Sequence, residues 1–332
     1  MIRHVAVVLV LAGAGCAQTG APPPSSPSAA VTPVTITAAP PRGTGYAERI
    51  QAKIRVDNGD GLAVVNGAVW VKTDDGRVVR VDPATNRVTG EARLDTSTDP
   101  SAYCLGITAV QGALWACSAT GTSTDVVEVA TSTLAVTRRA RVDKVFDQLS
   151  IPSAGGTLWV LSDNGAQATR LDTSTVRMTT TPLSVRCLQL AASSDMLVAT
   201  CATQSVVLLL DPRTGQVTGR AELPEPRLAA VLDGEVWVDT AKGLTRLRKD
   251  LSVAATYPSL SAGLGGDLVA AAGAIWLRTG KGVITKIDAT TGAPLQRIAP
   301  EADLTPGSLL VTNDSIWTTS SDDGLLYRLT LD

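Results

Sequence analysis

The sequence has very little of the chemistry on which enzyme sites most often depend. Its single histidine is His4, at the N-terminus. The rest of the chain therefore lacks the residue needed for Ser-His-Asp or Cys-His mechanisms and for histidine-ligated zinc. No nucleophile motif, phosphate loop or metal-ligand cluster is present either, and we expect no cofactor and no metal.

Aromatic residues and net charge are also scarce. Aromatic side chains make up 3% of the chain, and the formal net charge is −2. Without a basic field, nucleic acid and anionic membrane surfaces are poor electrostatic partners, and we expect no nucleic-acid binding. What is abundant is a hydrophobic content of 44%, with 29 glycines and 18 prolines, which predicts a sizeable globular core built of short strands and turns.

The first 16 residues have the pattern of an export signal. Arg3 precedes an apolar run over residues 5–12, which is too short for a stable membrane-spanning helix. The run ends in Leu11-Ala12-Gly13-Ala14-Gly15-Cys16, which resembles a bacterial lipobox but has Gly13 where that family prefers leucine. The resemblance implies lipidation of Cys16 and a lipoprotein on the outer face of the bacterial cell membrane. Cleavage after Ala14 or Ala17, which would release a soluble secreted protein, is the alternative.

Residues 17–44 are predicted to be a disordered tether. They are rich in Pro, Ser, Thr and Ala, including Pro22-Pro23-Pro24-Ser25-Ser26-Pro27, and they lack any apolar periodicity. Such a segment cannot bury enough apolar area to offset the entropy lost on ordering. It would hold a domain away from a membrane.

The rest of the chain, residues 45–332, repeats one short phrase. Gly67-Ala68-Val69-Trp70-Val71 is its clearest form, and equivalent positions recur every 39 to 45 residues at Trp70, Trp115, Trp159, Val198, Trp237, Trp276 and Trp317. A period near 40 with four short strands per unit is typical of a β-propeller. We therefore predict an all-β, seven-bladed propeller with four-stranded antiparallel blades.

The first unit shows the internal order of a blade. Strands are predicted at residues 62–65, 68–72, 77–81 and 88–94. Asn66-Gly67 favours a tight hairpin turn between the first two, and Asp82 can accept bonds from turn amides between the last two. The seventh unit supplies only three strands, at 309–312, 316–319 and 325–329, before the chain ends. Residues 49–56 alternate apolar and polar and can supply the missing outer strand, closing the ring with an N-terminal strand.

The turn phrases point to a family. Val81-Asp82-Pro83-Ala84-Thr85-Asn86-Arg87-Val88 and Leu210-Asp211-Pro212-Arg213-Thr214-Gly215-Gln216-Val217 resemble the YVTN-type propeller repeat of exported bacterial proteins. The resemblance implies the fold and says little about function. Streptogramin-inactivating lyases resemble the chain in architecture, but their catalysis relies on histidine, so we do not expect that activity.

Four cysteines follow Cys16, and they bracket two predicted hairpins. Cys104 with Cys117 and Cys187 with Cys201 are predicted to form disulfides, which is typical of an oxidising compartment. A three-residue turn at Ser193 to Asp195 would place the second pair in register, whereas the first pair needs a bulge. A metal site is the alternative, but neither pair is Cys-x-x-Cys and no histidine accompanies them.

Two further features have competing interpretations. The tryptophan column could bind sugars or cations, but one large apolar residue at a fixed place in each unit is what packing between blades requires, and we favour core packing. The acidic turns at residues 57–61, 74–76 and 322–324 could ligate calcium, but none has the complete calcium-loop spacing. Hydrogen bonding within each turn explains them more simply.

A binding site is predicted at one mouth of the central channel, on the loops that enter each unit and those between its second and third strands. The inner strands, such as residues 228–231 and 268–271, are small and apolar, so the channel wall itself is not expected to be polar. The polar residues of these loops are Asp60, Tyr103, Asp147, Gln148, Arg186, Glu225, Arg227 and Asp267.

The favoured function is a non-catalytic module of the cell envelope that binds a protein or another ligand as a monomer. Two alternatives remain. One is an enzyme of the lyase or hydrolase type that uses Asp, Glu or Arg at the channel mouth, and the other is a sensor of a small molecule or ion. The partner and the physiological process cannot be read from the residues.

Overall fold

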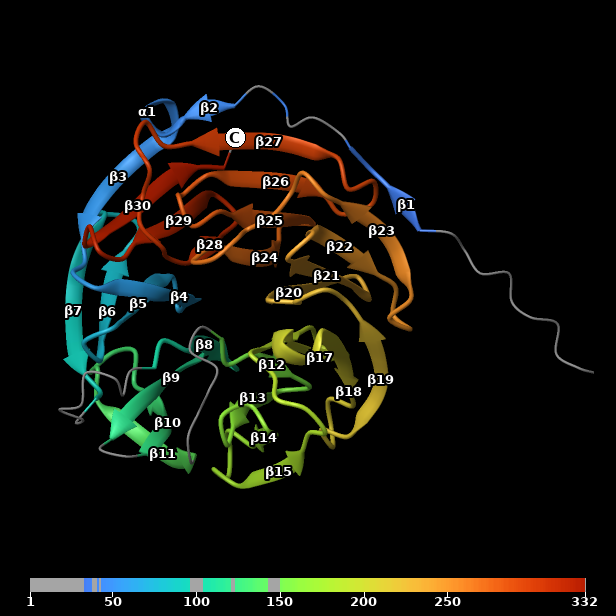
Figure 1. Ribbon diagram of the computed structural model, residues 1–332. Helices are drawn as coiled ribbons and strands as arrows, with labels where there is room; N and C mark the ends of the chain where they lie inside the picture. The colour runs from blue at the N-terminus through green and yellow to red at the C-terminus, as the bar shows by residue number, and fades with distance from the viewer. Residues whose placement is uncertain are drawn as a thin grey trace, which may run out of the picture. The chain divides into compact units, whose positions relative to one another are not determined.

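In the computed structural model, seven antiparallel sheets form a closed ring (Figure 1). The structure describes residues 33–37, 41, 43–95, 104–120, 123–142 and 150–331. Each sheet contains one blade of four antiparallel strands, which we name a to d from the channel outward, and two of the sheets carry a fifth, parallel strand. This confirms the predicted seven-bladed, all-β propeller.

The strands of each blade are as follows. Blade 1 has β4 (Gly59–Val65), β5 (Ala68–Thr73), β6 (Arg77–Asp82) and β7 (Arg87–Arg93). Blade 2 has β8 (Ile107–Val110), β9 (Ala113–Thr120), β10 (Ser123–Val129) and β11 (Val136–Val142). Blade 3 has β12 (Ser153–Ala154), β13 (Thr157–Ser162), β14 (Gln167–Leu171) and β15 (Met178–Pro182). Blade 4 has β16 (Gln189–Ala192), β17 (Leu197–Cys201), the short 3₁₀ helix η1 (Ala202–Gln204), β18 (Val206–Leu210) and β19 (Val217–Glu222).

Blade 5 has β20 (Leu228–Leu232), β21 (Glu235–Thr240), β22 (Gly243–Leu247) and β23 (Val253–Tyr257). Blade 6 has β24 (Asp267–Ala271), β25 (Ala274–Arg278), β26 (Ile284–Asp288) and β27 (Pro294–Ala299). Blade 7 has β28 (Leu309–Val311), β29 (Ser315–Ser320), β30 (Leu325–Thr330) and β3 (Ile50–Arg55).

The turns form as their residues predict. Asn66 and Gly67 both have positive φ, 52° and 75°, which is the geometry that the Asn-Gly hairpin turn requires. Asp82 accepts hydrogen bonds from the amide of Ala84 at 2.9 Å and the hydroxyl of Thr85 at 2.8 Å. Such local bonds fix the c–d turn and lower the pKa of the Asp82 carboxyl.

The hydrophobic core is divided into seven clusters, one at each interface between neighbouring blades. All six tryptophans are 0–1% exposed, and each lies in the cluster that its blade shares with the following blade. Val198 takes the equivalent place between blades 4 and 5. The tryptophan column is therefore interblade core, as predicted, and does not form a recognition surface.

The N-terminal segment closes the ring and continues along its outside. β3 pairs antiparallel with β30 and completes blade 7, as predicted. Ahead of it, β1 (Val34–Thr35) and β2 (Thr44–Gly45) add parallel strands to the outer edges of blades 5 and 6. The short helix α1 (Tyr46–Arg49) then buries Tyr46, whose hydroxyl donates to the carbonyl of Gly282 at 2.6 Å. Part of the segment predicted as a tether thus pairs with the propeller where it is described.

Both predicted disulfides are present, but the geometry around them differs from the expectation. Cys187 and Cys201 are joined. The turn between β16 and β17 spans four residues, from Ser193 to Met196, and is closed by a bond from Ser193 N to Met196 O, so the predicted three-residue turn at Ser193 to Asp195 is wrong. Cys104 and Cys117 are joined without a bulge in the ladder. The paired strand begins only at Ile107, and ahead of it the carbonyl of Gly106 accepts from the amide of Cys117 at 2.9 Å, which brings residues 104–106 alongside Cys117.

Candidate functional site

The candidate site lies at the end of the ring that carries the linkers between blades and the b–c turns, which we call the linker end. Its main contacts come from one position of strand b, which lies two residues after the tryptophan position. Side chains alternate along a strand, so this position faces the following blade like the tryptophan itself. In five blades the side chain at this position forms a hydrogen bond with the segment that leads into the following blade. The pairs are Lys72 with Asp95, Thr200 with Arg227, Asp239 with Ser261, Arg278 with Thr305 and Thr319 with Asp60.

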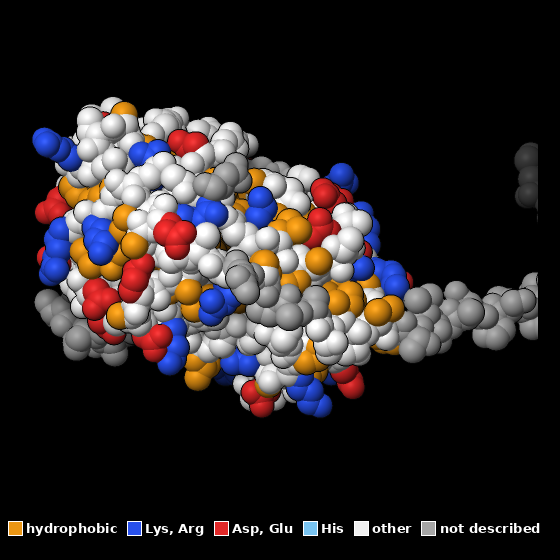
Figure 2. All heavy atoms as spheres, turned by 90° about the horizontal axis from the view of Figure 1, so that it is seen from above, with side chains coloured by type: hydrophobic (Ala, Val, Ile, Leu, Met, Phe, Trp, Pro, Cys, Tyr) orange, Lys and Arg blue, Asp and Glu red, His pale blue; other side chains and the backbone are white. Residues whose placement is uncertain are grey.

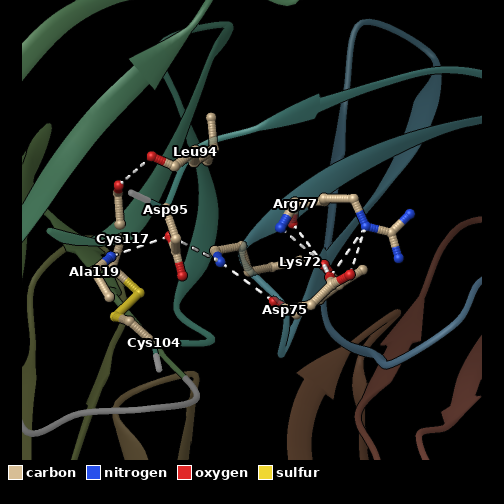
Figure 3. Close-up of polar contacts among 10 residues, drawn as sticks. Lys72, Asp75, Arg77, Leu94, Asp95, Cys104, Cys117 and Ala119 are labelled. Carbon is tan, nitrogen blue, oxygen red and sulfur yellow. Dashed lines mark hydrogen bonds and ion pairs between the residues drawn. A yellow bond between two sulfur atoms is a disulfide. The ribbon is translucent and has the colours of Figure 1, made fainter. Parts of the chain in front are cut away.

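Lys72 makes the first of these contacts as a buried ion pair. Its side chain is fully buried, and its ammonium lies 3.5 Å from the carboxylate of Asp95. Figure 3 shows Asp95 between Lys72 and Ala119, whose amide donates to the same carboxylate oxygen at 3.0 Å. Burial lowers the pKa of Lys72 and raises the pKa of Asp95, because each charged form loses hydration. The pair therefore fixes the linker from blade 1 to blade 2.

Arg278 has the same role between blades 6 and 7, although no carboxylate among the described residues is in hydrogen-bond contact with it. It is fully buried, and its guanidinium donates to Thr318 Oγ1 at 2.7 Å and to the carbonyls of Thr305 and Thr319 at 2.9 and 2.7 Å. It also contacts the carbonyl of Gly265 at 3.4 Å, in the preceding linker. Two linkers are thus held by one side chain.

Sequence reasoning missed these buried charged residues, although their position could have revealed them. Lys72, Asp239 and Arg278 each stand two residues after a tryptophan that was correctly assigned to the core. Period-2 alternation then requires the charged side chain to face the core as well, and a buried charge demands partners.

The channel wall carries polar contacts that the apolar inner strands did not predict. A cavity of about 260 Å³ lies along strands a. At its linker end, Ser150 Oγ donates to Leu190 O at 2.8 Å, Gln189 Oε1 accepts from Ala229 N at 2.7 Å, and Asp267 accepts from Leu309 N at 2.8 Å. Two of these contacts join the inner strands of neighbouring blades, and Ser150 joins the linker ahead of β12 to the inner strand of blade 4. The polar groups therefore hold neighbouring blades together.

Asp60 and Asp267 are the two predicted site residues that the fold brings together. They flank the start of β28: Asp60 accepts from Ser308 Oγ at 2.9 Å, and Asp267 accepts from the amide of Leu309. Burial raises the pKa of Asp60 to about 6 and raises that of Asp267 as well. Neither carboxyl forms a salt bridge in the described part of the chain.

The other described residues of the predicted site are dispersed. Arg186 and Glu225 are exposed, and Arg186 donates only to the carbonyl of Asn164 at 3.3 Å. Arg227 is partly buried, with its Nε 3.8 Å from the fully buried carboxylate of Asp239. Tyr103, Asp147, Gln148 and Cys16 lie outside the described residues.

Leu264 is the most exposed large apolar side chain of the described residues, at 84%. It stands on the linker from blade 5 to blade 6 between Gly263 and Gly265, whose φ values of 69° and 68° lie in the left-handed region. Arg278 and the amide of Gly307 both donate to the carbonyl of Gly265. An exposed leucine is therefore presented on a loop that the core holds in place.

Surface charge and metal-ligating side chains give little further indication of a ligand. Figure 2 shows acidic and basic side chains interspersed over the face in view, without a large area of one sign. Within the described ranges, no group of three or more His, Cys, Asp or Glu is arranged to hold a metal ion. In the acidic turns, Asp75 accepts from Thr73 and Arg77 instead. No described helix is long and apolar enough to cross a membrane.

Comparison with known proteins supports the propeller fold and identifies no family. No family model and no curated protein matches the sequence. Among solved structures, the chain is similar to BamB from Moraxella catarrhalis, with a TM-score of 0.57, 14% identity and coverage of 83% of this chain and 86% of that one. It is also similar to the Neurospora crassa Pan2 WD40 domain (TM-score 0.63, 10% identity, 83% and 90% coverage) and to the Myceliophteria thermophila Cps50 (Swd1) β-propeller domain (0.64, 12%, 86% and 99%). At these identities the likeness shows the propeller fold alone.

Proposed function

We propose that this protein is a non-catalytic binding module that presents its linker end to a protein partner. The observation that carries the proposal is Leu264, which is 84% exposed on a loop fixed by the buried Arg278. An apolar side chain held rigidly in solvent loses little entropy when a partner covers it, which is the condition for a binding hot spot. Asp239 holds the same linker through Ser261, and Thr200 holds the preceding linker through Arg227, so the surface is preorganised.

Site-specific photocrosslinking tests this proposal. A photoreactive residue in place of Leu264, in the full-length protein expressed in its own host, should capture a defined partner. The Leu264→Asp variant should lose that partner in a pull-down. Leu295, 51% exposed on the outer strand β27, is the matched control position and should capture nothing in common with position 264. Capture of the same proteins from both positions, or retention of the partner by Leu264→Asp, would refute the proposal.

The cellular location is part of the same proposal. We propose that the protein is exported, related to YVTN-type propeller proteins, and anchored through a lipid on Cys16. Two disulfides support an oxidising compartment. Incorporation of labelled fatty acid that is lost in Cys16→Ser would support the anchor, and an unlabelled, freely secreted wild-type protein would contradict it.

An enzyme remains the second candidate because of Asp60. A carboxyl with a pKa of about 6 at a channel mouth can act as a general acid or base near neutral pH. Turnover of any candidate substrate by the purified protein, lost in Asp60→Asn with unchanged folding, would favour this reading over the binding module.

A further inference from the structure

The opposite end of the ring, with the a–b and c–d turns, holds a repeated device that joins neighbouring blades. Four tryptophans of strand b stand directly across from a cation on strand c, with the cation 5.1–6.0 Å from the ring centroid: Trp70 with Arg80, Trp237 with Arg246, Trp276 with Lys286 and Trp317 with Arg328. The three arginines also reach the c–d turn of the following blade. Each is therefore a bridge between two blades.

In two blades this arginine is also neutralised by an acidic residue in its own a–b turn or directly after it. Glu235 in blade 5 lies 3.6 Å from Arg246, and Asp314 in blade 7 lies 3.3 Å from Arg328. Blade 1 has Ala68 where blade 5 has Glu235, counting back from the tryptophan. Arg80 consequently has no carboxylate partner among the described residues, and its hydrogen bonds go to neutral groups of Thr89 and Thr131.

A cavity of about 380 Å³ occupies this region between blades 1 and 2. Its volume lies at the lower end of the range for small-molecule sites. Trp70 and Arg80 line it together with Asn66 and Thr131. The cavity thus offers an uncompensated guanidinium, whereas the Trp70 indole N–H is buried away from solvent.

The one acidic side chain in the lining does not neutralise Arg80. Asp82 uses one carboxylate oxygen for the amide of Ala84 and the other for the hydroxyl of Thr85, both within its own turn. No salt bridge links it to Arg80. Among the described residues that line the cavity, the donor groups therefore outnumber the carboxylates available to them.

We propose that this cavity binds a carboxylate, which takes the place that Glu235 and Asp314 occupy beside their own arginines. A carboxylate would pair with Arg80 by charge-assisted hydrogen bonds. The group could belong to a free small acid or to an acidic side chain of another polypeptide. This site is independent of the linker-end surface, because it lies at the opposite end of the blades.

Calorimetric titration of the full-length protein distinguishes these sources. One arm uses glucuronate as a free acid, and the other uses a short capped peptide with a central glutamate. Binding of either probe supports the site and identifies the source. Arg80→Met should weaken that binding about 10- to 100-fold, the effect of losing a charged hydrogen-bonded partner. Ala68→Glu should abolish it, because the introduced carboxylate would lie where Glu235 lies in blade 5.

Two controls separate binding from folding. Arg246→Met removes an equivalent bridge that already has its own acid, so it should destabilise the protein without weakening the titrated binding. Ala68→Glu should also raise the melting temperature if the new carboxylate pairs with Arg80. The proposal is overturned if neither probe binds the wild type at millimolar concentration, or if Ala68→Glu binds as tightly as the wild type.

Discussion

Replacing Asp95 by asparagine should destabilise the propeller far more than the small change in shape suggests. The Lys72 ammonium would remain fully buried without its ion-pair partner, and only the charges of Asp74 and Asp75, with which it has no salt bridge, would offset it. At the observed separation of 3.5 Å, Coulomb attraction amounts to about 5 kcal/mol at an effective dielectric constant near 20. Breaking a buried pair by removing one partner costs about 3–5 kcal/mol. We expect a loss of this size in the free energy of unfolding, measured by urea titration at neutral pH.

The double variant Lys72→Met with Asp95→Asn provides the decisive comparison. Removing both charges also removes the desolvation cost that the pair carries, so this variant should lose only about 1–2 kcal/mol, mainly from imperfect packing. The coupling in the double-mutant cycle should then be at least about 2 kcal/mol. Additive effects, with a coupling below about 0.5 kcal/mol, would refute the claim that the two side chains act as a pair.

Three further predictions concern the channel, the disulfides and the ring closure. Because burial holds the pKa of Asp60 near 6, above its ordinary value of 3.8, its favourable contribution is complete below pH 3.8 and is lost as pH rises through 6. As pH rises across that interval, the free energy of unfolding of the wild type should fall by up to about 3 kcal/mol relative to that of Asp60→Asn, measured by urea titration at each pH. Replacing Cys187 and Cys201 together by serine should cost about 3 kcal/mol, and an unchanged urea midpoint would contradict this. Arg328→Met should lower the melting temperature because Arg328 bonds Asn86 across the closure between blades 7 and 1, whereas deleting residues 45–56 should unfold the domain, as circular dichroism would show.

The blade pattern could be predicted because it depends on local chemistry. Tryptophans that recur about every 40 residues mark strand b. Asn66-Gly67 forms its turn from the intrinsic freedom of those residues, and Asp82 bonds the amide of Ala84 in its own turn. Closure of the ring by residues 49–56 could be predicted because the last repeat contains three strands and a blade needs four. Each of these inferences needs only neighbours in sequence or one repeated period.

The site could be predicted only in part, because its contacts join residues from different blades. Asp60 and Asp267 were identified as residues of the channel mouth, but their placement on either side of Ser308 depends on blades 6, 7 and 1 meeting there. Leu264 gave no sign of its exposure, because that depends on how Arg278 holds its loop. The pairing of β1 and β2 with the outer strands of blades 5 and 6 likewise joins segments far apart in sequence, and amino-acid composition does not predict it.

By itself, therefore, the sequence determined the number of blades, the packing role of the tryptophans and the cysteine pairs. Those features arise from periodicity, turn chemistry and spacing, which are properties of a segment and its repeats. Only the tertiary structure decided where the buried charges of Lys72, Asp239 and Arg278 find partners, and which arginine lacks one. The physical reason is that a charge removed from water is satisfied by whatever group the neighbouring blade brings within a few ångströms, and that group is distant in sequence.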